Sequence, residues 1–383
     1  FTVADSFRSD FGIPTWITGM VMATLIGMVI IGGIKRIGKV ASRLVPFMAA
    51  IYFVTTITIL LLNANLIPQA FSTIFRDAFN AKAGVGGFFG SSFMFMLIWG
   101  VKRGIFSNEA GQGSAPIAHA AAKTEEPARE GLVAMLGPYI DTLMICTLTG
   151  LTIVTLGVWK DKKNAEIHFT EQAQVSLIRA EGTIGQNGVI RDEHRIETGR
   201  LEVIDGEVPE AIFVKNHSTV DNAVIMLDEE RFDGFIEIVS EGNLRFLDSG
   251  GMEIDTGEVV LYGKILLNGS PLTAWAFQRG LSRFFDGGNY IVSIAVFLFA
   301  LSTAISWSYY GDRSIEYLFG RKAIMPYRIV FCIVHFLGAI FSLELVWGFG
   351  DTALGLMAIP NLIAILALSG KVRKLARDYF SRY

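Results

Sequence analysis

The sequence predicts an all-α polytopic membrane protein that carries an inserted small all-β domain. Two observations predict the membrane part. Of the 383 residues 51% are apolar, with a mean hydropathy of +0.45, and six or seven apolar segments approach the roughly 20 residues that span a bilayer as a helix. The third observation predicts the insert: residues 160–264 hold 22 acidic and 11 basic residues, whereas the rest holds 14 and 22. This composition excludes a disordered chain and argues against an ordinary soluble domain.

The predicted spans follow one another along the chain. They are residues 14–33, 44–63, the interrupted segment 90–122, 132–159, 290–310, 327–345 and 346–370. Residues 34–43 are expected to form a loop, and residues 64–80 an interfacial helix with spaced apolar positions. The last two spans are almost continuous, so a tight turn is expected at Trp347–Gly350. The expected parts are membrane helices over 1–159 and 269–371, the insert 160–268 and a basic tail 372–383.

Basic residues predict the orientation of the loops. Loops 34–43, 123–130 and 311–328, with the tail after Gly370, hold 15 of the 22 basic residues outside the insert, whereas the opposite loop 64–89 holds only two. Lys and Arg concentrate in cytoplasmic loops. We therefore expect a cytoplasmic C-terminus and an extracytoplasmic insert.

The insert is predicted to be a small β-domain. Six short runs of alternating apolar and polar residues lie between turns rich in Gly, Asp and Asn, the pattern of β-strands. They are residues 174–178, 201–204, 211–214, 235–239, 244–247 and 259–266. About 100 residues suffice for an independent core. The acidity favours solubility over ligand binding, and the sequence indicates no partner for the insert.

The most informative stretch is Gly100–Pro116, because it places charges and several glycines inside an apolar segment. Charged side chains such as Lys102, Arg103 and Glu109 cost at least ~2.5 kcal/mol each at membrane depth, so they usually face a cavity or a pathway. We expect the helix to unwind over Gly104–Gly113, where exposed backbone lines a protected site. The alternative is a polar loop between two short helices.

Such a break supplies groups that bind ions and amino acids. Half-helix N-termini suit a carboxylate, and carbonyl groups at a C-terminus suit a cation. Ser107 and Asn108 add a hydroxyl and an amide. Lys102, Arg103, Glu109 and Asp141 are candidates for coupling or structural charges. Asp141 is expected to face the interior and to pair with Lys102 or Arg103.

A second candidate site lies on the span 290–310. Ser302, Thr303 and Ser306 concentrate hydroxyl groups in an apolar helix, and uncharged oxygens suit a weakly held Na⁺. Thr303 and Trp307, four residues apart, share a helix face, where the indole would wall a small side-chain pocket. The alternative, equally weighted, is that these hydroxyls make packing contacts between helices.

No enzyme chemistry is indicated. Cys146 and Cys332 lie in apolar runs and behave as small hydrophobic residues. The five histidines show no metal-ligand spacing, and the glycine-rich stretch lacks the ending of a phosphate loop. The sequence therefore predicts neither an enzyme nor a nucleic-acid-binding protein.

Residues 100–116 resemble the signature of the alanine/glycine:cation symporter family. The likeness continues at Gly33–Lys39, Leu301–Gly311 and Gly355–Asn361, and covers about residues 1–159 and 270–370. The resemblance implies a leucine-transporter-type fold of two inverted five-helix repeats, with the spans here as fold helices four to seven and eight to ten. It also implies Na⁺-coupled, or sometimes H⁺-coupled, uptake of alanine, glycine or similar amino acids across the bacterial inner membrane.

The resemblance also implies site residues. The substrate site would include Gly104, Phe106, Ser107, Asn108, Thr303 and Trp307, and Ser302 and Thr303 would bind the coupling Na⁺. Two features depart from the family pattern: the first broken helix would precede Phe1, as in an N-terminally truncated member, and the β-rich insert is longer than expected. The alternative function is a transporter-like receptor or regulator that senses a ligand through the insert.

Overall fold

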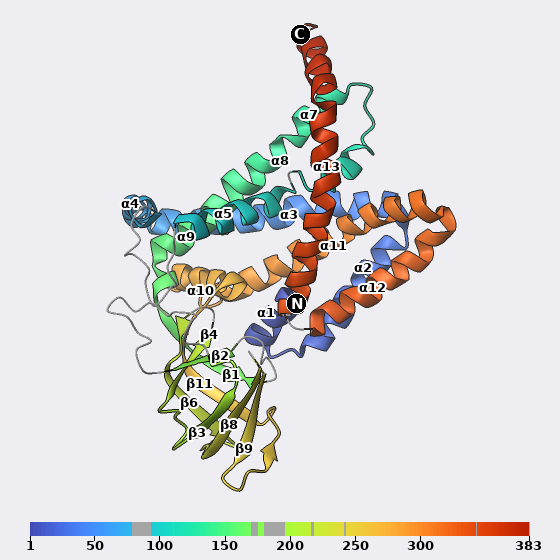
Figure 1. Ribbon diagram of the computed structural model, residues 1–383. Helices are drawn as coiled ribbons and strands as arrows, with labels where there is room; N and C mark the ends of the chain where they lie inside the picture. Colours follow the sequence, from blue (N-terminus) through green and yellow to red (C-terminus); the bar gives the residue numbers. More distant parts are fainter. Residues whose placement is uncertain are drawn as a thin grey trace. The chain divides into compact units, whose positions relative to one another are not determined.

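The computed structural model of the chain contains two compact units, each with its own hydrophobic core. The first comprises residues 1–64, 98–152 and 273–383, and the second residues 65–97 and 153–272. Figure 1 shows the helices and strands that form them. The structure describes residues 1–78, 93–109, 111–169, 175–179, 196–215, 218–240, 243–341 and 343–382.

Apolar helices make up the first unit. They are α1 (Thr2–Phe11), α2 (Thr15–Ile30), α3 (Gly33–Leu62), α5 (Phe93–Asn108), α6 (Ala115–His119), α7 (Pro127–Ala134), α8 (Leu136–Pro138), α9 (Thr147–Leu156), α10 (Gly269–Leu281), α11 (Gly288–Phe319), α12 (Ile324–Ile340) and α13 (Leu343–Phe380), with some residues of α5, α9 and α10 counted in the second unit. A π-helical segment, η2 (Tyr139–Cys146), joins α8 to α9, and short 3₁₀ turns lie at Ala64–Leu66, Val158–Lys160 and Arg321–Ala323. Five described stretches are long and apolar enough to cross a membrane: Arg36–Leu62, Pro127–Leu156, Gly288–Phe319, Arg321–Ile340 and Leu345–Phe380.

Two helix pairs form the centre of the first unit. α2 packs along α12, and α3 packs along α11. The buried apolar residues of this core are Met22, Ile26, Ile30, Ile37, Leu301 and Ile305. The close approach of α2 to α12 depends on Gly19, because a Cβ there would lie 2.7 Å from the Cβ of Ala339. Small residues at such crossings let membrane helices pack closely.

Two predicted loops are in fact helical. Residues 34–43 belong to α3, and residues 311–319 extend α11. Hydropathy marks only the part of a helix that lies in the apolar layer. The backbone hydrogen bonds continue beyond it, because Lys and Arg are good helix formers.

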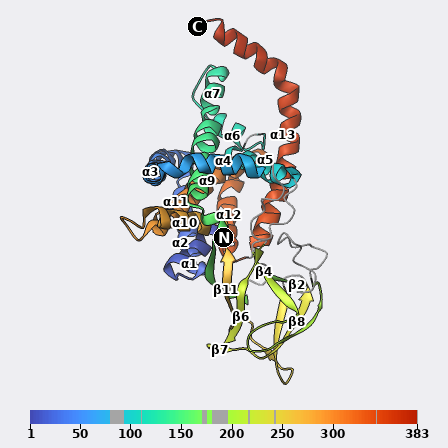
Figure 2. The same ribbon diagram turned by 90° about the vertical axis from the view of Figure 1, so that its left-hand side faces the viewer.

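The predicted turn at Trp347–Gly350 is also wrong. α12 ends at Ile340, Phe341 has an extended backbone (φ −76°, ψ 163°), and α13 has begun by Leu343. Two glycines inside a long apolar helix lower its stability without ending it. α13 includes most of the basic tail and contains Pro360, and it curves along its length (Figure 2).

The second unit is mainly β-structure, with the amphipathic helix α4 (Ile67–Ala78) where the interfacial helix was predicted. The strands are β1 (Lys162–His168), β2 (Val175–Arg179), β3 (Gly199–Val203), β4 (Ala211–Lys215), β5 (Ser218–Thr219), β6 (Asp221–Leu227), β7 (Glu230–Arg231), β8 (Gly234–Ser240), β9 (Asn243–Asp248), β10 (Glu253–Ile254) and β11 (Val259–Leu266). They form antiparallel sheets in the orders β1-β11-β6-β7, β10-β9-β8-β3 and β2-β4-β5. The Phe169 and Phe246 rings pack against each other in the core, tilted by 57° with their centres 4.6 Å apart.

All six predicted strands are confirmed, as β2, β3, β4, β8, β9 and β11. The sequence missed β1, β6 and the two-residue strands β5, β7 and β10. β1 carries few apolar residues, yet it pairs with β11 along its whole length, from Lys162 opposite Leu266 to His168 opposite Val260. β1 thus forms a strand because it pairs with the apolar strand β11, since the tendency to form a strand depends on the neighbouring strands.

The C-terminal tail is bound to the loop before α7. The Arg382 guanidinium donates to both Glu126 carboxylate oxygens, at 2.6 and 3.0 Å, and these hydrogen bonds lower the pKa of Glu126 from its ordinary 4.5. A carboxylate whose pKa is lower in the folded than in the unfolded state stabilises the folded state at pH values above the unfolded-state pKa. This stabilisation is lost as the pH falls through the folded-state pKa. We expect acid below pH 4.5 to release the tail.

Spin labels at Glu125 and Ser381 measure this release. Their distance distribution should be narrow at neutral pH and broad in acid. Arg382→Gln, the control, should give the broad distribution at both pH values. A distribution that does not change with pH in the unsubstituted tail would contradict the expectation.

Candidate functional site

Within the segment predicted to be interrupted, α-helix stops at Asn108, the end of α5, and resumes at Ala115, the start of α6. Between them φ is 56° at Glu109, 75° at Gly111 and 95° at Gly113, whereas Ala110 lies outside the described residues. Residues in this left-handed region cannot continue a right-handed helix.

The break starts later than predicted. Gly104–Asn108, expected to be unwound, is helical. One interior glycine costs a helix about 1 kcal/mol and does not end it. Two side chains then cap the carbonyls that the helix end exposes: Asn108 Nδ2 donates to the Gly104 carbonyl at 3.0 Å, and Gln112 Nε2 donates to the Ile105 carbonyl at 3.3 Å. The last turn therefore offers side chains and carbonyls rather than unwound backbone.

Glu109 connects the break to α11 through a hydrogen bond. Its Oε1 accepts a hydrogen bond from Trp307 Nε1 at 2.8 Å, and its Oε2 accepts one from the buried Ser114 hydroxyl at 2.5 Å. The Tyr310 ring lies beside the indole, with the two ring centres 5.8 Å apart. Hydrogen bonds to a charged group are stronger than neutral ones. The break and the tryptophan predicted to line the substrate pocket are thus in direct contact.

The end of α5 also contacts the π-helical segment η2. The Ser107 hydroxyl donates to Asp141 Oδ2, and Asn108 Nδ2 donates to Thr142 Oγ1 at 3.0 Å. Ser107 is thus the partner that the structure gives Asp141, in place of the expected Lys102 or Arg103. π-Helical turns are rare and frequently occur at functional sites, and here one faces the helix break.

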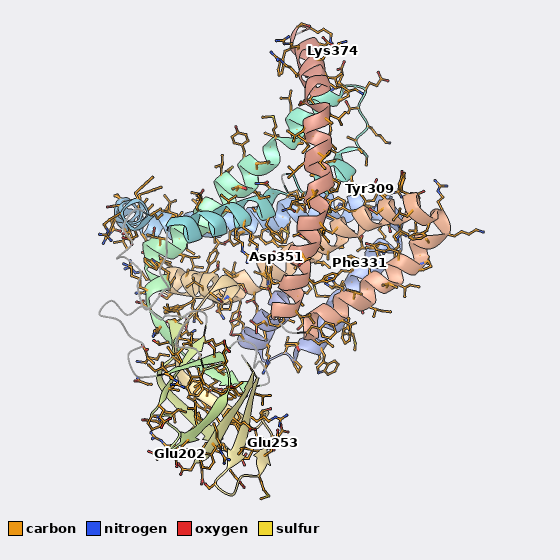
Figure 3. All side chains as sticks on the ribbon, viewed as in Figure 1. Glu202, Glu253, Tyr309, Phe331, Asp351 and Lys374 are labelled. Carbon is orange, nitrogen blue, oxygen red and sulfur yellow. The ribbon has the colours of Figure 1, made fainter. Side chains whose placement is uncertain are left out.

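The positive side chains of α5 face α13. Lys102 Nζ lies 2.6 Å from Asp351 Oδ2, on the helix labelled at Asp351 in Figure 3. The Arg103 guanidinium lies 4.4 Å from the centre of the Trp347 ring, and the Phe106 ring lies 5.7 Å from the same ring. An arginine above an aromatic face is stabilised by a cation–π interaction, so α5 and α13 are held together by charge and ring contacts.

The break packs against the middle of α13. A Cβ on Gly113 would lie 3.2 Å from Asn361 Cβ and 3.4 Å from the Met357 carbonyl oxygen. These residues flank Pro360, which lies inside α13 and has no N–H to donate to the carbonyl four residues earlier. Two helices with altered backbone hydrogen bonding therefore meet at this point.

The predicted Na⁺ ligands occupy successive positions of α11. Ser302 is buried, and its hydroxyl contacts the Phe299 carbonyl at 2.9 Å and Met48 Sδ at 3.7 Å. Thr303 is exposed, on the face that it shares with the half-buried Trp307. The two neighbouring residues therefore differ in exposure.

Sequence reasoning missed five residues that contact the predicted ones: Gln112, Ser114, Thr142, Tyr310 and Trp347. Tyr310 follows Trp307 by three residues, and this spacing places both on one helix face. Thr142 is adjacent to Asp141. Trp347 gave no usable signal, because it was assigned to a turn.

Curated proteins with related sequences are named as transporters. The sodium/alanine symporter AgcS of Methanococcus maripaludis is 36% identical over 97% of this chain and 58% of its own length. The sodium/proton-dependent alanine carrier protein of Bacillus sp. (strain PS3) is 29% identical over 99% of this chain and 64% of its own. The probable sodium/glutamine symporter GlnT of Bacillus subtilis is 26% identical over 99% and 56%. The chain thus spans about three fifths of the length of these relatives, whose names give no support to a receptor.

A model of the sodium:alanine symporter family matches residues 1–188 and 255–383 and leaves 189–254, in the β-rich unit, unmatched. This match confirms the resemblance found at residues 100–116. Since symporters are transporters, it also confirms that no enzyme is to be expected. With five helices among its described residues able to cross a membrane, the protein is a multi-pass membrane protein, and the chain belongs to the sodium:alanine symporter family.

Proposed function

We propose that the protein is a secondary active transporter that couples inward movement of Na⁺, or alternatively H⁺, to the uptake of alanine, glycine or similar small amino acids across the inner membrane. The observation that carries this proposal is the break at 109–114, joined to Trp307 through Glu109. Non-helical backbone at membrane depth is tolerated only where it lines a protected cavity. Broken helices of this kind form substrate sites in secondary transporters.

The groups around the break suit a small zwitterion. The C-terminal end of α5 is the negative end of the helix dipole and attracts an ammonium group or a cation. Phe106 and Trp307 supply ring surfaces for a small apolar side chain. The proposed substrate contacts are Gly104, Phe106, Ser107, Asn108, Thr303 and Trp307. Lys102 and Asp351 form an ion pair, so their charges are balanced in this arrangement.

The proposed coupling site for Na⁺ uses the hydroxyls of Ser302 and Thr303. Uncharged oxygens bind a cation weakly enough to release it in each cycle. Ser302 would exchange its contact with the Phe299 carbonyl for the ion. H⁺ coupling would instead use a carboxylate near the break, for which Glu109 and Asp141 are the candidates.

The proposed fold is of the leucine-transporter type, with the spans as fold helices four to ten. An early helix packs on a late one in both α2–α12 and α3–α11, which supports repeats that pack on each other. The proposed orientation, from the basic loops, has the insert 160–268 outside and the C-terminus in the cytoplasm.

The experiment that tests this function is uptake of labelled alanine by the intact protein in liposomes. An inward Na⁺ gradient should drive accumulation, and replacing Na⁺ by choline in the absence of a proton gradient should abolish it. Restoration by a proton gradient alone would identify H⁺ as the coupling ion. Equal uptake with and without either gradient would exclude coupled transport.

Trp307 is expected to control both affinity and size selection. Trp307→Phe keeps a ring but removes the indole donor to Glu109. Loss of a hydrogen bond to a charged group costs about 1.5–3 kcal/mol, so the KM for alanine should rise about tenfold or more. Trp307→Ala should in addition admit larger amino acids. The measurement is inhibition of alanine uptake by unlabelled amino acids of increasing size.

Trp16→Phe is the matched control, because the Trp16 ring on α2 is exposed. It should leave KM and selectivity unchanged. If Trp307→Ala kept the wild-type order of inhibition, Trp307 would not line the pocket.

A further inference from the structure

Gln112 lies in the break between two glycines and is only 6% exposed. Its amide orientation follows from its neighbour. The Ile105 carbonyl can only accept, so Nε2 must face it, at 3.3 Å. The carbonyl oxygen Oε1 therefore points the other way.

Gln112 Oε1 is buried and has no hydrogen-bond partner in the part of the chain that the structure describes. A buried acceptor without a partner is destabilising, and native proteins contain few such groups, many of them explained by a water or an ion. The other unpartnered buried groups among the described residues are the donors or hydroxyls of Thr18, Thr155 and Trp159. Thr155 lies at the C-terminal end of α9 and Trp159 in the 3₁₀ turn after it, and none of the three groups is an obligate acceptor.

The groups around Gln112 carry negative charge or partial negative charge. The Glu109 carboxylate lies three residues earlier, and the Glu109 carbonyl accepts the Gln112 N–H at 3.2 Å. The C-terminal end of α5, whose Ile105 carbonyl holds the amide, adds the negative end of a helix dipole. A free carbonyl oxygen beside these negative groups is a favourable partner for a positively charged group.

We propose that Gln112 Oε1 binds a small cationic group in the transport cycle, either the ammonium group of the amino acid or the coupling cation. This proposal rests on the proposed transport function. The oxygen is closed to solvent in the present arrangement, so the ligand reaches it when the 109–114 segment moves. Because the amide is uncharged, it binds a cation weakly enough for release.

The test is ligand binding to the purified intact protein, measured separately for labelled alanine at saturating Na⁺ and for labelled Na⁺ at saturating alanine. Gln112→Met has a similar shape and no acceptor oxygen. It should raise one dissociation constant about tenfold or more, as expected for a lost hydrogen bond to a charged group. A rise for alanine identifies the ammonium group, and a rise for Na⁺ identifies the coupling ion.

Thr18→Val is the matched control, because it too removes a buried unpartnered polar atom, at a position in α2 away from the break. It should leave both constants unchanged. Gln112→Glu keeps an acceptor oxygen and should bind the affected ligand at least as tightly as the wild type. If Gln112→Met does not fold, the dissociation constants of Gln112→Glu test the proposal.

Two outcomes overturn the inference. One is unchanged binding of both ligands in Gln112→Met, and the other is weakened binding in both Gln112 variants, which would show that the side chain acts through the hydrogen bond of Nε2 to the Ile105 carbonyl. If either outcome occurs and the wild-type protein still binds alanine and Na⁺, only the role of Gln112 is overturned, and the proposed transport function stands. Wild-type protein that binds neither ligand overturns the function as well.

Discussion

Replacing Arg328 by alanine is expected to destabilise the protein by about 3–5 kcal/mol, because it leaves a buried carboxylate without its partner. Arg328 donates to both Asp312 oxygens, with Nη2 at 2.6 Å and Nε at 3.1 and 3.2 Å, and the two side chains are 11% and 2% exposed. Its Nη1 also reaches the Ile31 carbonyl at 3.4 Å. The pair therefore joins α11, α12 and the residue that follows α2.

Arg321→Ala is the matched control. Arg321 lies seven residues before Arg328 and pairs with Glu316 at 3.1 Å, but it is 88% exposed, and exposed pairs contribute about 0–1 kcal/mol. Thermal and denaturant unfolding of the purified protein should show a large loss for Arg328→Ala and almost none for Arg321→Ala.

The double variant Arg328→Met with Asp312→Leu distinguishes the loss of the ion pair itself from the cost of leaving the Asp312 carboxylate unpaired. It removes both charges and should regain most of the stability, since apolar pairs often replace buried ion pairs without loss. Equal stability losses in Arg328→Ala and Arg321→Ala would show that the buried carboxylate finds another partner.

Gly113→Ala is expected to reduce alanine uptake about fivefold or more. Gly113 has φ 95°, a conformation that L-residues rarely adopt, and the new Cβ would lie 3.2 Å from Asn361 Cβ and 3.4 Å from the Met357 carbonyl oxygen. Strain of this kind costs about 1–3 kcal/mol, and 1.4 kcal/mol corresponds to a tenfold change. Relief requires movement of either the break or α13, and both movements displace the groups around the site.

Gly100→Ala supplies the comparison within the same segment. Gly100 is helical in α5, and an added Cβ would meet nothing within 4 Å. Alanine favours a helix over glycine by about 1 kcal/mol, so this variant should be at least as stable as the wild type and should transport normally. If both variants behaved alike in uptake and thermal unfolding, the left-handed backbone of the break would have no functional role.

The sequence was sufficient where the physical cause is local. Long apolar runs identified five described helices able to cross a membrane. Alternation identified six of the strands, and glycines with charges identified the segment where α5 ends. The sequence did not predict correctly where the helices begin and end. Basic residues 34–43 looked like a loop because hydropathy drops there, although the helix continues. Gly348 and Gly350 suggested a turn, although α13 passes through both.

The family membership of the chain, its membrane class and the presence of a helix break were determined by the sequence, because a residue's polarity and backbone freedom are its own properties. Only the tertiary structure decided which groups meet: Glu109 with Trp307, 198 residues away, Ser107 with Asp141, Lys102 with Asp351, and Gln112 Oε1 with no partner among the described residues. Hydrogen bonds and ion pairs depend on distances of a few ångströms between separate helices. Those distances are set by how the helices pack, which no local pattern encodes.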